Sequence, residues 1–150
     1  MTETCDPWLQ ILDRYKTAVF DKDVEAFMAI HDDDLHVFDM WGRWSLRGAK
    51  AWREMATGWF SSLGNERVVV SANDAESTQN ADLMIGHATL TFAAMSAEGK
   101  ELRSLNNRLT AALRRSGGSW KIFHAHTSVP IEHQSLKGIL RRETDGPARQ

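Results

Sequence analysis

The sequence predicts an α+β fold in which three N-terminal helices pack on a curved antiparallel sheet. Apolar residues recur with a helical period as far as about residue 63, and they alternate with a period of two between about residues 66 and 129. The order of these patterns matters, because helices followed by a run of strands form segregated layers rather than alternating strand and helix units. We therefore expect a cone-shaped domain whose helices cover one face of the sheet.

Length and composition fit one domain with a hydrophobic core. The chain has 150 residues, 42% of them hydrophobic, and a formal net charge of −2. We expect a single domain over residues 1–130. The C-terminal extension, residues 131–150, ends in a polar stretch, and we expect it to be partly disordered.

The first helix is predicted over residues 7–20. It begins at the start signal formed by Asp6 and Pro7. Its apolar stripe consists of Trp8, Ile11, Leu12, Tyr15 and Val19.

A short second helix is predicted next. Asp21 or Asp23 is its candidate N-cap, and the acidic triplet Asp32-Asp33-Asp34 is expected to end it. Its stripe consists of Val24, Phe27, Met28 and His31.

A strand over 35–40 and an extended segment over 44–47 are predicted on either side of a turn at Gly42-Arg43. Gly48 then introduces the third helix. The stripe of that helix consists of Trp52, Met55, Ala56, Trp59, Phe60 and Leu63.

Four strand-like runs complete the domain. They cover about residues 66–76, 82–95, 101–115 and 119–129, with turn residues between them. Consecutive strands of this kind predict an antiparallel meander. In the extension, a helical turn is expected around Leu136, Ile139 and Leu140.

Charge and motif content exclude several classes of protein. The pI of about 6.3 and the scattered Lys and Arg residues do not provide the basic surface that nucleic-acid binding requires. No apolar run approaches the roughly 20 residues of a membrane span, and the N-terminus lacks the pattern of a signal peptide. We therefore expect a cytoplasmic protein with neither nucleic acid nor membrane as a partner. The single cysteine, Cys5, is interpreted as incidental.

The last predicted strand carries two histidines. Side chains two positions apart on a strand share a face, so His124 and His126 are expected to form a polar pair beside Trp120 and Ile122. Such a pair either lines a pocket or is buried with polar partners.

The same pair raises the question of a metal. Further ligands would come from His36, His87 or Asp39. No helical or cysteine metal-binding motif accompanies the histidines, so we predict no metal site and assign no cofactor.

The helix order, the meander and the final strand, Trp120-Lys121-Ile122-Phe123-His124-Ala125-His126-Thr127-Ser128, resemble the NTF2-like superfamily over roughly residues 8–130. Within this match lie three more specific segments, the strand Arg108-Leu109-Thr110, the turn Gly117-Gly118-Ser119-Trp120 and the end His124-Ala125-His126-Thr127-Ser128-Val129-Pro130. Within the superfamily they are similar to SnoaL-like small proteins and to the association domain of calcium/calmodulin-dependent protein kinase II. The resemblance implies a cone-shaped, cystatin-like fold. It does not select a function, because the superfamily contains isomerases, dehydratases, cyclases and noncatalytic modules.

The N-terminal half resembles ketosteroid isomerase in the order and spacing of its residues. The matching segments are Tyr15, Asp23-Val24-Glu25-Ala26, Asp33-Asp34 and Val37-Phe38-Asp39. This resemblance implies that Asp39 is a general base and that Tyr15 is an oxyanion-hole donor. The second oxyanion donor of the isomerase is an acid, and the corresponding strand here contains none. Its Arg108 instead favours an anionic ligand.

Other side chains are candidates for substrate binding. Asn106 shares a polar strand face with Arg108, and this face lines a pocket or meets solvent. Trp41 and Trp44 flank the turn beside Asp39 and are candidate ligand stackers, and Trp59 is a candidate pocket wall. His124 and His126 complete the candidate substrate-binding set.

The two candidate catalytic residues also have structural interpretations. Asp39 is also placed to cap a turn before Gly42. Tyr15 continues the apolar stripe of the first helix, so it is also interpreted as a core residue with a satisfied hydroxyl.

Two classes of function follow. The first is a small-molecule pocket protein, with proton-transfer chemistry of the isomerase, dehydratase or cyclase type on a small organic substrate, which is acidic if Arg108 binds it. The second is a noncatalytic oligomerisation or ligand-sensing module. Both predict a homodimer, because Leu105, Leu109 and Leu113, or the alternating residues on the neighbouring strand, leave an apolar sheet face uncovered by one layer of helices.

Overall fold

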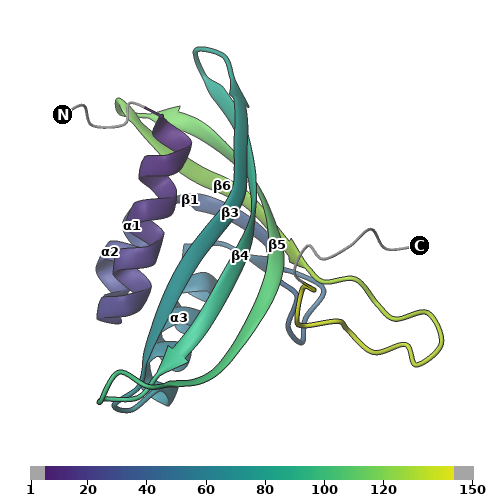
Figure 1. The fold of residues 1–150 in the computed structure, drawn as a ribbon. Helices are drawn as coiled ribbons and strands as arrows, with labels where there is room; N and C mark the ends of the chain where they lie inside the picture. Colours follow the sequence, from purple (N-terminus) through teal and green to yellow (C-terminus); the bar gives the residue numbers. More distant parts are fainter. Residues whose placement is uncertain (1–5, 144–150) are drawn as a thin grey trace.

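The computed structural model describes residues 6–143, which form three helices and six strands (Figure 1). Two of the strands precede the third helix, and the other four follow it. The elements are α1 (Pro7–Asp21), α2 (Val24–Ala29), β1 (His31–Phe38), β2 (Leu46–Arg47), α3 (Ala49–Ser62), β3 (Arg67–Gln79), β4 (Leu83–Met95), β5 (Glu101–Ser116) and β6 (Ser119–Ser128). The expected α+β fold class is confirmed. In this part of the chain no helix is long and apolar enough to cross a membrane.

The six strands form one curved sheet in the order β2-β1-β6-β5-β4-β3. The strands from β3 to β6 form the expected antiparallel meander. The first strand, β1, lies beside β6 and runs parallel to it, so the sheet is mixed at this position. All three helices lie on the same side of the sheet (Figure 1). We call the covered side the inner face and the opposite side the outer face.

Helix α1 is fixed to β4 by a close contact between Trp8 and Gly86. The carboxylate of Asp6 caps the helix by accepting a hydrogen bond from the backbone N–H of Trp8 at 2.8 Å. The indole of Trp8 is 1% exposed and donates to the carbonyl of His87 at 3.2 Å. A Cβ on Gly86 would lie 2.4 Å from the ring of Trp8. Glycine is therefore required here because the indole occupies the space of a side chain.

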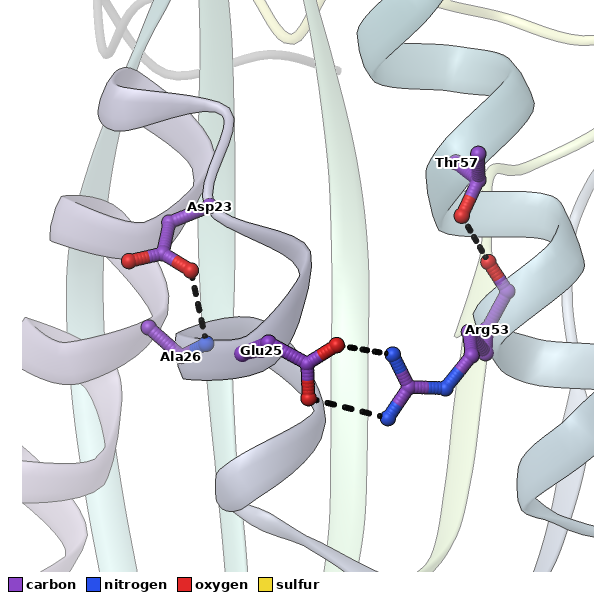
Figure 2. Close-up of polar contacts among 5 residues, drawn as sticks. All are labelled: Asp23, Glu25, Ala26, Arg53 and Thr57. Atoms are coloured by element: carbon purple, nitrogen blue, oxygen red, sulfur yellow. Dashed lines mark hydrogen bonds and ion pairs between the residues drawn. The ribbon is translucent and has the colours of Figure 1, made fainter.

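Helices α2 and α3 are joined by polar contacts (Figure 2). Asp23 caps α2 by accepting a hydrogen bond from the N–H of Ala26 at 3.0 Å. The guanidinium of Arg53 on α3 binds both carboxylate oxygens of Glu25 on α2. Thr57 donates to the carbonyl of Arg53 at 2.8 Å, one helical turn earlier. The two helices are thereby held as one layer over the inner face.

The second helix is shorter than the sequence pattern predicted. It ends at Ala29, and the acidic triplet lies in β1 instead of ending the helix. Contacts with β6 and β5 explain the difference, because the carbonyl of Ile30 accepts a hydrogen bond from Ile122 on β6, and Asp32 binds Arg114 on β5 at 3.0 Å. These partners lie about 80 or more residues along the chain, beyond the reach of local periodicity.

His31, expected on the helical stripe, is instead a buried residue of β1. Its Nδ1 donates to the carbonyl of Phe27 at 2.8 Å, and its Nε2 accepts from the indole of Trp52 at 3.2 Å. Burial lowers the pKa of His31 to about 4. The neutral ring therefore joins α2, α3 and the sheet.

The C-terminal extension forms a hairpin-like turn rather than the expected helical turn. Ile131 pairs with Gly138 in an antiparallel bridge, and Leu136 has a positive φ of 61°. The left-handed conformation at Leu136 interrupts a helix, which explains the departure from the apolar spacing. The part of the extension predicted to be disordered includes residues 144–150, which lie outside the described residues.

Candidate functional site

Asp39 lies where β1 ends and the chain turns toward β2. Its Oδ1 accepts a hydrogen bond from the hydroxyl of Thr127 at 3.0 Å. The same hydroxyl oxygen accepts from the N–H of Met40 at 3.0 Å. Burial raises the pKa of Asp39, and hydrogen bonds from Thr127 and from the backbone of Met40 and Trp41 offset the rise only in part. The protein thus holds this carboxylate in one orientation and makes it more basic.

Asn107 is a polar residue on the inner face that the sequence analysis did not select. It is 7% exposed, and its Nδ2 contacts the sulfur of Met40 at 3.4 Å. Its Oδ1 is the one buried side-chain oxygen or nitrogen within residues 6–143 that has no hydrogen-bond partner. Buried amides are normally satisfied, so this oxygen has unused capacity to accept a hydrogen bond. The alternation of Leu105, Leu109 and Leu113 places this amide on an apolar face, and this signal was available in the sequence.

Tyr15 lies among aromatic rings on the inner side. Its ring makes an edge contact with Phe92 at a centroid distance of 6.4 Å, and Trp59 contacts the ring of Phe92 at 6.2 Å. The hydroxyl of Tyr15 has no hydrogen-bond partner among residues 6–143. Burial, and then the charge of Asp39, raise the pKa of Tyr15, so the hydroxyl keeps its proton at neutral pH. We call Tyr15, Asp39, Asn107 and Thr127 the inner cluster.

A groove of about 620 Å³ lies on the other side of Asp39, beneath the loop between β1 and β2. We call it the outer groove. It is lined by His36, Phe38, Asp39, Met40, Gly42, Arg43, Trp44, Ser45 and His126. Asp39 and Met40 touch both the groove and the residues of the inner cluster. The two regions therefore meet at the carboxylate.

His124 and His126 do not lie beside Trp120 and Ile122 as the period of two predicted. The register with β5 shifts between Ile122 and His124, which indicates a β-bulge at Phe123. This extra residue reverses the alternation, so Trp120 and Ile122 are buried on the inner face and both histidines point outward.

On the outer face the two histidines pack around one phenylalanine. The ring of Phe38 makes edge contacts with His124 at 4.9 Å and with His126 at 5.4 Å. Nδ1 of His124 lies 2.7 Å from the carbonyl of His36 and donates to it. His126 reaches the outer groove, whereas His124 stabilises the strand beside it.

Arg108 and Asn106 lie on the outer face, away from the inner cluster. Nε of Arg108 donates to the hydroxyl of Ser128 at 3.1 Å. The amide of Asn106 donates to Thr91 at 2.8 Å and accepts from the N–H of Arg142 at 2.7 Å. The polar strand face of the prediction is thus the uncovered face. Its asparagine anchors the C-terminal extension instead of lining the groove.

The tryptophans are divided between the two regions. Trp44 lines the outer groove and is 97% exposed, whereas Trp59 belongs to the inner aromatic group. Trp41 is 56% exposed and does not line the groove. The structure therefore brings Asp39, Trp44 and His126 together.

The candidate metal ligands do not converge. Within residues 6–143, no three His, Cys, Asp or Glu side chains are close enough to hold one ion. His36 contacts the guanidinium of Arg47 at 3.1 Å, and such a cation opposes a metal ion at the same ring.

The sequence and the fold were compared with those of known proteins. The sequence matches the SnoaL-like domain over residues 9–132. No curated protein sequence matches the chain significantly.

Solved structures show the same fold. An NTF2-like protein of unknown function from Pseudomonas putida KT2440 is 22% identical, with a TM-score of 0.78 over 90% of this chain and 92% of that one. A protein with a cystatin-like fold from Caulobacter vibrioides is 19% identical, with a TM-score of 0.68 over 87% and 92% of the two chains. A protein from Xanthomonas campestris, named for the calcium/calmodulin-dependent protein kinase II association domain, is 12% identical, with a TM-score of 0.70 over 85% and 88%. The family match shows that this chain belongs to the SnoaL-like domain family, and the solved structures show that it has an NTF2-like, cystatin-like fold.

Proposed function

We propose that this protein binds a small organic molecule at Asp39 and moves a proton on it. The observation that carries this proposal is a half-buried carboxylate of raised pKa together with two polar groups that make no hydrogen bond to residues 6–143, of which one is fully buried. Those groups are the Oδ1 of Asn107 and the hydroxyl of Tyr15. Satisfied polar groups would indicate a purely structural cluster, whereas unsatisfied ones favour a ligand that completes them.

Each residue has a distinct role in the proposed reaction. Asp39 accepts a proton from the substrate and returns it to another atom, and its raised pKa makes it a stronger base than an exposed aspartate. Thr127 positions the carboxylate through its hydrogen bond. Tyr15 keeps its proton and donates to the oxygen on which negative charge develops. Asn107 accepts a hydrogen bond from the substrate.

Proton exchange measured by NMR tests the activity. A panel of enolisable ketones and keto acids is incubated with the protein in D₂O, and loss of the α-proton signal is followed. The intact protein is expected to accelerate exchange for at least one compound, and Asp39→Asn should lower that rate by roughly 10²–10⁴-fold. The control is Asp33→Asn, because Asp33 is exposed on β1, the strand that leads to Asp39, and its replacement should leave the rate unchanged.

The same experiment addresses the noncatalytic alternative. Exchange that is equal with and without the protein for every compound would contradict proton transfer. If native mass spectrometry then showed a retained ligand or a large ring, the result would favour a ligand-sensing or assembly module.

The proposal includes a homodimer in the cytoplasm. Leu109 and Leu113 lie on the inner face beneath the helices, so they are not the dimer surface. The outer face of β4 and β5 carries no helix and includes Ile85, which is 56% exposed. Sedimentation of the purified protein should give twice the mass of the chain, and a monomer at micromolar concentration would contradict this part.

A further inference from the structure

We propose that the ligand is a planar aromatic anion bound in the outer groove, with its ring against Phe38 and Trp44 and its acidic group on Arg43. This inference rests on the proposed function, because it names the class of molecule that reaches Asp39. It replaces Arg108, the cation favoured by the sequence, with a different arginine.

The first argument is the exposure of two aromatic rings. Trp8 and Trp52 are 1% and 7% exposed, so this chain can bury its tryptophans fully. Trp44 is 97% exposed on the loop that covers the groove, and Phe38 is 37% exposed on its floor. Two large apolar rings that meet water in one groove offer a stacking surface for an aromatic ligand.

The floor is held rigidly enough to bind a ring. Phe38 makes edge contacts with His36 at 4.9 Å and with His124 and His126. These three rings hold the phenyl group in place, and 37% of the residue stays exposed. A preorganised surface of this kind loses little conformational entropy when it binds.

The second argument is charge. Arg53, Arg103 and Arg114 each bind a carboxylate, but the guanidinium of Arg43 has no hydrogen bond or ion pair among residues 6–143. Arg43 lines the groove, and its five N–H donors remain available.

The acid in the groove forms no ion pair with Arg43. Asp39 is the one acidic residue among the described residues that line the groove. Its carboxylate already accepts hydrogen bonds from Thr127 and from the backbone of Met40 and Trp41. An incoming carboxylate or sulfonate therefore finds a free guanidinium, which binds such groups in bidentate geometry.

The size of the groove agrees with this class of ligand. A volume of about 620 Å³ falls in the range of about 300–1,000 Å³ that is typical of small-molecule sites. One or two fused aromatic rings with one acidic group fit this range. The ligand would then lie with one edge toward Asp39 and Met40, the two residues through which the groove meets the inner cluster.

Calorimetric titration of two matched probes tests the inference. The probes are 2-naphthoate and neutral 2-naphthamide, which share the ring system and differ in charge. We expect 2-naphthoate to bind saturably, and Arg43→Gln to weaken it by about tenfold while leaving 2-naphthamide unchanged. Trp44→Ala should weaken both probes.

Arg14→Gln is the matched control, because Arg14 is exposed on α1, outside the groove. Chemical shifts in the amide spectrum should change for Phe38, Arg43 and His126. Equal affinity of the two probes, or an equal loss in Arg14→Gln and Arg43→Gln, would overturn the anion assignment while leaving proton transfer at Asp39 intact. Absence of saturable binding by either probe would overturn the aromatic class as well.

Discussion

The inner cluster and the outer groove meet at Asp39 but are built by opposite means. The inner cluster holds polar groups inside an apolar layer, and the buried Oδ1 of Asn107 has no partner there. The outer groove holds apolar rings in water, with Trp44 97% exposed. The buried region therefore contains an unsatisfied polar group, and the exposed region contains apolar rings, although burial disfavours the first and water the second. The proposed ligand accounts for both departures, because it would satisfy the inner polar group and cover the outer rings.

The sharpest test of this comparison is a pair of truncations on the two faces of the sheet. Leu113 is 0% exposed on the inner face, and Ile85 is 56% exposed on the outer face. Leu113→Ala should lower the free energy of unfolding by about 2–5 kcal/mol, because it leaves a cavity in the core. Ile85→Ala should change it by less than about 1 kcal/mol. Urea denaturation measures both, and equal losses would show that the outer face is covered in solution.

Acid should lower the free energy of unfolding by protonating His31, which is buried on the inner side of the sheet. Its folded-state pKa of about 4 lies below the ordinary value of 6.5, so the neutral ring stabilises the fold above pH 6.5. This contribution is lost as the pH falls through 4, and it corresponds to about 3 kcal/mol. Urea denaturation between pH 7 and 4 should show the loss in the native protein and in His124→Asn. The loss should be much smaller in His31→Phe, and an unchanged pH dependence in that variant would contradict the assignment.

Two glycines sharpen the same comparison at the level of packing. Gly86→Ala places a methyl group 2.4 Å from the ring of Trp8 and should lower the free energy of unfolding by about 1–3 kcal/mol. Gly58 lies in α3, where a Cβ would meet no neighbouring atom within 4 Å, so Gly58→Ala should raise stability by up to about 1 kcal/mol. Thermal unfolding of the two variants should show shifts of opposite sign. A neutral Gly86→Ala would mean that Trp8 moves easily.

The fold was predictable because its signals are local and repeated. The signals for the stripe of α1, for its start at Asp6 and for the four strands of the meander each lie within a short stretch of sequence, and the structure confirms these elements. The end of α2 was not predictable from local pattern. It depends on the pairing of β1 with β6, which lies about 90 residues along the chain.

The candidate site was predictable only in part, because the face of each strand depends on its bulges. A bulge at Phe123 turned His124 and His126 outward. On β5 the alternation is regular, and it would have placed Asn107 on the inner face with the leucines. The prediction instead relied on the polar face of the strand, and it therefore named Arg108 and Asn106. The proximity of Asp39 to Trp44 followed from sequence because both lie near one short turn. The roles of Asp39 and Tyr15 remain proposals.

Two substitutions inside the inner cluster complete the comparison. Thr127→Val removes the donor to Asp39 and the acceptor for the N–H of Met40, so it should lower the free energy of unfolding by about 1–2 kcal/mol. It should also raise the pKa of Asp39 further, because the lost hydrogen bond stabilised the carboxylate.

Asn107→Leu should behave differently, although both residues are polar and lie on the inner face. The amide makes one weak contact with the sulfur of Met40 and leaves its oxygen unsatisfied, so replacing it with leucine should leave stability unchanged or raise it by up to about 1 kcal/mol. Urea denaturation measures the stability of both variants, and a carbon-detected NMR titration measures the pKa of Asp39. A loss in Asn107→Leu as large as that in Thr127→Val would mean that the amide is satisfied within the protein. A gain in stability combined with a loss of proton exchange would separate the two roles, because a group that costs stability and supports turnover is retained for its ligand.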